Sequence, residues 1–257
     1  VEGTTNLVDA FGLVGIILGL HAVNGDVWAC VAATEDMVTF TSAIVQVNGE
    51  TGEEISRYDF LAPGFCNDLI SDAQGNVYAT DSAGGIIYKL NAGEDTLTEW
   101  ATGYASAEPG GFSLNGIIMS PDQSSVLVGR FDNGELIDIP VNMDGAAGEA
   151  TVSQPAGAPN AIGFDGLVSW RGFVAAVFDG GVVGMQNVEG AWVAQEFIPA
   201  GVLDFPTTLT IDNHGNIWVV EGQLGYFLDD DETTNATLPF GVHRFSPQMQ
   251  GLVTNQE

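Results

Sequence analysis

Residues 67–78 read NDLISDAQGNVY, which is a polar anchor, an apolar-rich strand, a tight turn and the start of a second apolar strand. Related phrases begin at Asn115 (NGIIMSPDQSSVLV), Asp165 (DGLVSWRGFVAAV) and Thr207 (TTLTIDNHGNIWVV), and a weaker one begins near Ile17 (ILGLHAVNGDVWACV). The anchors therefore recur at intervals of 50, 48, 50 and 42 residues. A period in the forties, with several short strands in each unit, is typical of a β-propeller.

The phrases divide the chain into five units in which apolar strands alternate with turns rich in Gly and Asn. We expect a single all-β domain over residues 1–257, with blades at about 15–60, 66–103, 114–154, 164–199 and 206–247. The fifth unit carries an acidic insertion at 229–237. Equivalent positions of successive blades converge on the propeller axis, so we expect the anchors Asn67, Asn115, Asp165 and Thr207 to meet in space.

The charge is extreme, because 34 acidic residues face 5 basic ones and the formal net charge is −29. Such a surface repels phosphate backbones, so we expect no nucleic-acid partner. No apolar run approaches the roughly 20 residues of a membrane helix, so we expect no membrane partner. The simplest interpretation of the charge is a solubility or salt adaptation of the whole surface. The functional alternative is attraction of cations toward a negative cavity mouth.

Two cysteines, Cys30 and Cys66, stand near the expected boundary of the first two blades. They form either a disulfide or two buried thiols, and the sequence leaves both alternatives open. The chain starts at Val1 rather than Met, as a processed or trimmed chain does. We expect an extracellular or periplasmic location, with the cytoplasm of a salt-adapted organism as the alternative.

Four stretches together resemble the SMP-30/gluconolactonase/LRE-like family. They are GFCNDLISDAQGNVYATDSAGGIIYKL (64–90), GGFSLNGIIMSPDQSSVLVG (110–129), GFDGLV (163–168) and PTTLTIDNHGNIWVVE (206–221). The resemblance implies a six-bladed propeller with a divalent metal, often calcium, at the bottom of the central cavity, and a lactonase or related ester hydrolase activity. Five blades are legible, so either the propeller has five blades or a first blade lies upstream of Val1. A missing blade would expose sheet edges and favour self-association.

By this resemblance Asn115 and Asp165 match two metal ligands, and Asn67 matches an asparagine beside the metal or the substrate. The family's remaining ligand is a glutamate in the first blade. Glu2 stands in the right dipeptide with Gly3, but it precedes Asn67 by only 65 residues and is a poor match. The chain therefore departs from the family at this ligand.

The side chains themselves support the same chemistry. Asn67, Asn115 and Asp165 offer only oxygen ligands, which favour Ca²⁺ and then Mg²⁺ or Mn²⁺ over zinc. A metal there would polarise an ester carbonyl or acidify bound water. The structural alternative is that each residue caps its own turn. Asp68 is the candidate general base, or else a cap for backbone N–H groups, and Thr207 either lines the substrate cavity or is an ordinary strand threonine.

Two functions remain in competition. The first is a metal-dependent hydrolase of lactones or small esters, with Asp68 and Asp165 catalytic, Asn67 and Thr207 contacting the substrate, and a small-molecule lactone or ester as the partner. The second is a non-catalytic propeller that serves as a binding or scaffold module. The three histidines are scattered. His214 is interpreted as an exposed turn residue and His243 as structural, and His21 is either a core histidine or a neighbour of the cavity.

Overall fold

The computed structural model describes residues 15–35, 39–158, 163–225 and 237–246. Within these ranges the strands form five antiparallel sheets, and in each sheet the strands follow one another in chain order. The first sheet contains β1 (Ile16–Val23), β2 (Asp26–Ala33), β3 (Thr41–Asn48) and β4 (Glu54–Asp59). The second contains β5 (Cys66–Ser71), β6 (Val77–Asp81), β7 (Ile86–Leu90) and β8 (Leu97–Ala101). The third contains β9 (Leu114–Met119), β10 (Ser125–Arg130), β11 (Leu136–Pro140) and β12 (Thr151–Ser153). The fourth contains β13 (Leu167–Trp170), β14 (Phe173–Phe178), β15 (Gly181–Val188) and β16 (Ala191–Ile198), and the fifth contains β17 (Pro206–Ile211), β18 (Ile217–Glu221) and β19 (Val242–Phe245).

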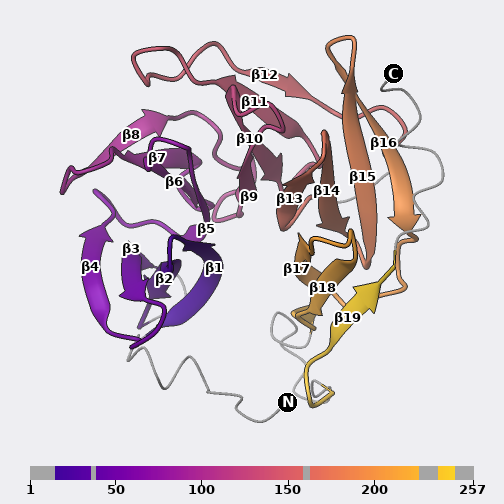
Figure 1. Ribbon diagram of the computed structural model, residues 1–257, viewed down its shortest axis with the longest axis horizontal. Coiled ribbons are helices and arrows are strands. Elements are labelled where there is room, and N and C mark those ends of the chain that lie inside the picture. Colours follow the sequence, from indigo (N-terminus) through magenta and orange to yellow (C-terminus); the bar gives the residue numbers. More distant parts are fainter. Residues whose placement is uncertain (1–14, 36–38, 159–162, 226–236, 247–257) are drawn as a thin grey trace.

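The sheets are the blades of a β-propeller, as the repeat predicts. Figure 1 shows them following one another in an arc, with the first strand of each sheet innermost. These innermost strands contact one another in the order β1, β5, β9, β13 and β17. The described residues form the five blades that are legible in the sequence, and the sixth blade was implied only by the family resemblance. The acidic insertion at 229–237 falls largely outside the described residues, as does Glu2.

Apolar layers between consecutive sheets hold the blades together. Cys30 and Ile44 of the first sheet pack with Leu69 and Tyr88 of the second, and comparable layers separate the later sheets. A strand such as β14 lies between two layers, so all six of its residues are buried. This explains why the central strands read as continuous apolar runs rather than as an alternating pattern.

The turn of the repeated phrase has a structural role. The Asp72 carboxylate accepts hydrogen bonds from the backbone N–H groups of Gln74 and Asn76 and from the Asn76 side-chain amide. Asp212 makes the same bonds with the residues of its own turn, which include the exposed His214. The second half of the recurring phrase therefore encodes a tight turn between two strands and not a binding site.

Cys30 and Cys66 form a disulfide, which decides between the two alternatives that the sequence left open. The bond joins β2 to the first residue of β5, so it ties the first blade to the second. It closes a loop across a sequence separation of 36 residues. By the chain-entropy relation, a loop of this length corresponds to about 4 kcal/mol of stabilisation.

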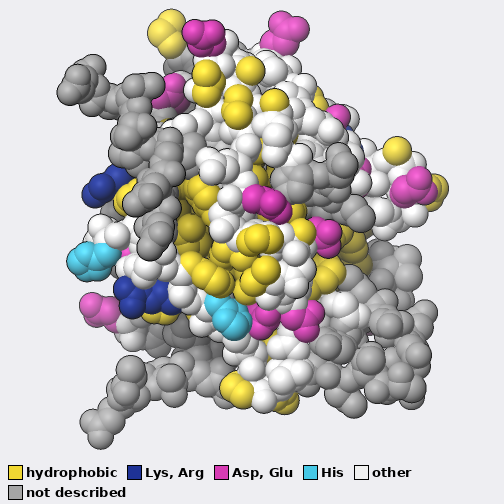
Figure 2. Space-filling view, turned by 90° about the vertical axis from the view of Figure 1, so that its right-hand side faces the viewer, with side chains coloured by type: hydrophobic (Ala, Val, Ile, Leu, Met, Phe, Trp, Pro, Cys, Tyr) yellow, Lys and Arg dark blue, Asp and Glu magenta, His cyan; other side chains and the backbone are white. Residues whose placement is uncertain are grey.

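The surface carries its negative charge in a dispersed way. Figure 2 shows hydrophobic side chains gathered in the middle of one face, with carboxylates scattered around them and few Lys or Arg side chains. Within the described residues, no helix is long and apolar enough to cross a membrane.

Candidate functional site

Four of the five innermost strands carry a β-bulge near the start, and in the fourth sheet the two residues just before β13 oppose Val177 in the same way. In the second sheet Cys66 pairs with Asp81 and Leu69 with Ala79, so Asn67 and Asp68 together oppose the single residue Thr80. Bulges of the same kind fall at the equivalent place in the other sheets. The bulged residues are Leu18 and Gly19 opposite Cys30, Asn115 and Gly116 opposite Gly129, Asp165 and Gly166 opposite Val177, and Thr207 and Thr208 opposite Val220. The anchors of the repeated phrase are therefore the first residues of four bulges, and bulges re-aim side chains next to functional sites.

Glycine at the second bulge position lets neighbouring innermost strands approach closely. A Cβ added to Gly116 would lie 2.4 Å from the carbonyl oxygen of Asp165, and one added to Gly166 would lie 2.7 Å from the Cα of Thr208. A Cβ added to Gly19 would lie 2.5 Å from the Cα of Asp68. These contacts are too short for any side chain, so the bulges of adjacent blades lie directly against one another.

Asp68 occupies the bulge position that is glycine in three of the other sheets. Its Oδ1 accepts a hydrogen bond from the backbone N–H of Leu69 at 2.8 Å, and its Oδ2 accepts one from the backbone N–H of Ile117 at 3.1 Å. The carboxylate thus reaches from β5 across to β9. Strict strand alternation would send Asp68 and Asn67 to opposite faces, but the bulge breaks that alternation.

Two carboxylates of this site are partly buried and act on each other. Burial raises the pKa of Asp68 to about 6, although the N–H groups of Ile117 and Leu69 oppose the rise. The pKa of Asp165 is raised well above its usual range, first by burial and then by the negative charge of Asp68. Hydrogen bonding with the Asn115 side chain and with the Gly166 backbone lowers the pKa of Asp165 and so opposes this rise in part. Like charges in a site of low dielectric favour either a retained proton or a bound cation.

The structure brings together three of the residues that were singled out in the sequence. Asp165 is affected by the negative charge of Asp68 and by hydrogen bonding with Asn115, and the Asn115 side chain is only 6% exposed. The Asn67 side chain makes no hydrogen bond with the described part of the chain, and its predicted roles at the metal and at the substrate stay predictions. Thr207 lies against Gly222, because a Cβ there would be 2.4 Å from the Thr207 methyl group. Its predicted role in substrate binding stays a prediction.

The donor chemistry of the cluster fits a hard cation. Carboxylate and amide oxygens are the ligands of Ca²⁺ and related ions, and two carboxylates would balance a divalent charge. Among the described residues no group of three or more His, Cys, Asp or Glu side chains could hold a metal. A cation here would therefore depend on the Asn115 amide beside Asp68 and Asp165. The first sheet contributes Leu18 and Gly19 at the equivalent bulge, neither of which has a donor side chain.

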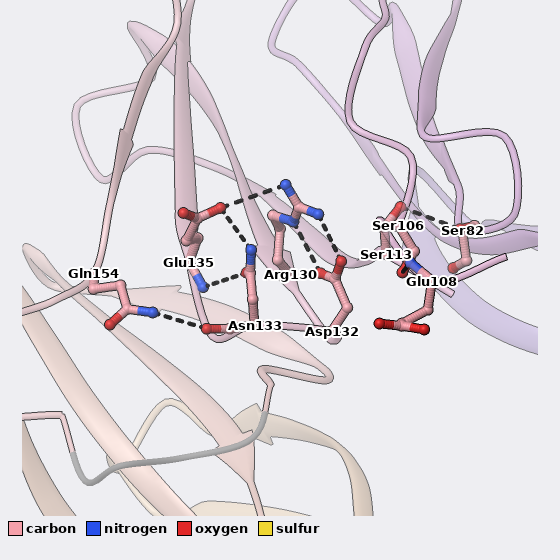
Figure 3. Close-up of polar contacts among 9 residues, drawn as sticks. All are labelled: Ser82, Ser106, Glu108, Ser113, Arg130, Asp132, Asn133, Glu135 and Gln154. Carbon is pink, nitrogen blue, oxygen red and sulfur yellow. Dashed lines mark hydrogen bonds and ion pairs between the residues drawn. The ribbon is translucent and has the colours of Figure 1, made fainter. Parts of the chain in front are cut away.

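His21, His243 and Arg130 are engaged elsewhere, and His214 lies exposed in the turn after β17. His21 hydrogen-bonds Ser71 at 2.9 Å, and His243 lies 2.9 Å from a Glu221 carboxylate oxygen. Arg130 ends β10 and pairs with Asp132 at 2.6 Å and with Glu135 at 3.4 Å. Figure 3 shows the guanidinium enclosed by these acids in a network that includes Asn133 and Gln154. The Arg130 network therefore braces the loop after β10.

Sequence reasoning missed Thr80. Its side chain is fully buried, and its hydroxyl lies between the backbones of Asp68 and Asn115. A threonine in an apolar strand carries no distinguishing signal of its own. Thr80 could have been found from the sequence only by recognising the bulge at Asn67 and Asp68, because Thr80 is the residue that faces it.

Comparisons with known proteins support the fold. No protein-family model and no curated protein matches the chain. Among solved structures, virginiamycin B lyase from Staphylococcus aureus is similar, with a TM-score of 0.56 and 14% identity over 80% of this chain and 63% of that one. A gluconolactonase from Xanthomonas campestris has a TM-score of 0.53 and 19% identity over 75% of this chain and 69% of that one. A luciferin-regenerating enzyme has a TM-score of 0.57 and 14% identity over 92% of this chain and 78% of that one.

At such identities the likeness shows the fold, which is a β-propeller architecture shared with lactonase-like enzymes. The matched region spans less than two thirds of the length of the virginiamycin B lyase. The structural neighbours thus include a gluconolactonase and a luciferin-regenerating enzyme at low identity, and no family model assigns the chain to the SMP-30/gluconolactonase/LRE-like family.

Proposed function

We propose that the protein hydrolyses lactones or small esters at a divalent cation, with Ca²⁺ as the preferred ion, held by Asn115 and Asp165 beside the Asp68 carboxylate. The observation that carries the proposal is a set of two partly buried carboxylates and one buried asparagine at the inner ends of three adjacent blades, where Asp68 bonds across to β9 and Asp165 interacts with Asn115. Two such charges oppose folding unless a positive charge or a proton is present. The similarity to a gluconolactonase and to a luciferin-regenerating enzyme makes a small-molecule substrate the preferred partner.

Each residue would have a distinct role in this reaction. A bound divalent cation would supply polarisation of the substrate carbonyl. Asp68 has a pKa near 6, so it suits the removal of a proton from an attacking water at neutral pH. Asp165 and Asn115 would hold the ion and fix its place against the carbonyl. The Asn67 amide, which is free of hydrogen bonds to the described residues, would orient the substrate.

A thermal-shift experiment with Ca²⁺, Mg²⁺ and Mn²⁺ tests the cation site. At a cation concentration of 100 times Kd the expected stabilisation is about 2.7 kcal/mol, or roughly 5–10 °C in Tm for a domain of this size. Asp165→Asn should abolish the shift. Asp95→Asn removes the same charge from an exposed turn between β7 and β8 and should leave the shift unchanged. A full shift in Asp165→Asn would place the ion elsewhere.

A panel of γ- and δ-lactones and short-chain esters then tests the reaction, with and without the preferred cation. Asp68→Asn should lower kcat by about 100-fold or more if the carboxylate accepts the water proton. Hydrolysis that is independent of both the cation and Asp68 would contradict the proposal.

A binding or scaffold function is the second candidate. It is favoured by the first sheet, whose bulge supplies Leu18 and Gly19 where a further ligand would complete the ion's shell. Under this function the chain would show a cation-dependent Tm shift with no turnover of any lactone or ester in the panel.

A further inference from the structure

We propose that Thr80 is a positioning residue that sets Asp68 and Asn115 in register with each other across the boundary of the second and third blades. The inference rests on the proposed function, because the two residues that it aligns are those that would meet the cation. Thr80 is 0% exposed and lies on β6. Its Oγ1 accepts a hydrogen bond from the backbone N–H of Asp68 at 3.1 Å and donates one to the backbone carbonyl of Asn115 at 2.8 Å.

The bulge explains why a hydroxyl is needed at this position. Asn67 and Asp68 oppose Thr80 alone, so one residue of β5 has no regular ladder partner. The Thr80 hydroxyl takes the N–H of Asp68 and thereby replaces the missing ladder bond. The residues opposite the other four bulges are Cys30, Gly129, Val177 and Val220, none of which carries a hydroxyl. The hydroxyl therefore occurs opposite the one bulge whose second residue is an aspartate.

The hydrogen bonds of Thr80 form part of a closed set. Thr80 bonds the backbones of Asp68 and Asn115, and the Asp68 carboxylate bonds the N–H of Ile117, two residues beyond Asn115 on β9. The position of the carboxylate relative to β9 is therefore fixed at two points. A shift of β9 along the blade boundary would break both bonds together.

A second bridge lies next to this set, at the end of β6. The Ser82 hydroxyl donates to the carbonyl of Leu114, and the backbone N–H of Ser113 donates to the carbonyl of Ser82 at 2.9 Å. Figure 3 shows the contact between Ser82 and Ser113. These bonds hold Ser113 and the first residue of β9 but end one residue short of Asn115. Among the hydrogen bonds of the described residues, those of Thr80 are the ones by which a side chain joins the backbones of Asp68 and Asn115.

The test compares Thr80→Val with Thr80→Ser. The first keeps the shape of the side chain and removes the hydroxyl, whereas the second keeps the hydroxyl. Thr98→Val is the matched control, because Thr98 also donates its hydroxyl to a backbone carbonyl, that of Lys89, but on the outer strand of the same blade. Affinity for Ca²⁺ is measured by isothermal titration, and the side-chain ¹³C shifts of Asp68 and Asn115 are measured by NMR without metal.

We expect Thr80→Val to weaken Ca²⁺ binding by roughly 10-fold or more, since removing a residue that orients a metal ligand typically costs 10- to 100-fold in affinity. Thr80→Ser should stay within about threefold of the wild type, and Thr98→Val should bind like the wild type. Thr80→Val should also move the ¹³C shifts of both Asp68 and Asn115, which Thr98→Val should leave in place.

Two outcomes overturn the inference. The first is wild-type affinity and unmoved shifts in Thr80→Val, and the second is a loss of affinity in Thr80→Ser equal to that in Thr80→Val. If the wild type binds no cation, the proposed function fails, and the ¹³C shifts alone then decide whether Thr80 sets the geometry of Asp68 and Asn115.

Discussion

The stability of the metal-free protein should rise as the pH falls from 8 toward 4, because the native state holds the Asp68 proton more tightly than the unfolded chain does. The pKa of Asp68 is raised from 3.8 to about 6 in the folded state. Above pH 6 the ionised, partly buried carboxylate therefore opposes folding by about 3 kcal/mol, taking 1.36 kcal/mol per pKa unit over the difference between 6 and 3.8.

The direction of the stability change and the pH range over which it occurs follow from the folded and unfolded pKa values of Asp68. Between pH 6 and 3.8 the folded state binds more protons than the unfolded state, so stability increases with acid and the gain is complete below 3.8. About half of the 3 kcal/mol is regained at pH 5, which corresponds to roughly 3–6 °C in Tm for a domain of this size. Asp165 acts in the same direction, because its pKa is also raised.

The assay is urea unfolding of the wild type and of Asp68→Asn at pH 8, 6.5 and 5, in the presence of a chelator. High salt screens the general repulsion of a chain with a net charge of −29. The wild type should gain about 1.4 kcal/mol more than Asp68→Asn between pH 8 and 5. Identical pH dependence in the two proteins would refute the assignment of a raised pKa to this carboxylate. Saturating Ca²⁺ should reverse the trend, since protons would then compete with the ion.

Three further outcomes follow from the geometry. Replacing Cys30 and Cys66 together by Ala should lower the free energy of unfolding by about 4 kcal/mol, measured by urea titration. Gly166→Ala should destabilise the fold by roughly 1–3 kcal/mol, because the new Cβ would lie 2.7 Å from the Cα of Thr208. Gly225→Ala is the control, because a Cβ at Gly225 meets nothing within 4 Å. Asn115→Ala should weaken Ca²⁺ binding by at least about 10-fold in titration calorimetry, and unchanged binding would exclude its amide as a ligand.

The fold was predictable because the repeated phrase contains two physical signals. The turn residues Asp72 and Gly75, with their counterparts Asp212 and Gly215, mark the same tight connection in two blades. The apolar strands on either side mark sheets that are buried between neighbours. A period in the forties then leaves few architectures other than a propeller. The disulfide could not be decided in advance, because pairing requires the distance between two blades.

The candidate site was predictable only in part. The anchors Asn67, Asn115 and Asp165 stand out because they are polar at a recurring position before apolar strands. The bulges that aim them depend on the pairing register between strands, which a single sequence does not reveal. The choice between a general base and a backbone cap for Asp68 therefore stayed open, and the contribution of Thr80 was not visible at all.

The most direct test of the central claim is a crystal structure of the protein grown with Ca²⁺. We predict one ion between the second, third and fourth blades, with Asp165 and Asn115 oxygens at about 2.3–2.6 Å and the Asp68 carboxylate beside it. A structure that shows these side chains sharing no ion at saturating Ca²⁺, or Ca²⁺ bound only to surface acids, would contradict it.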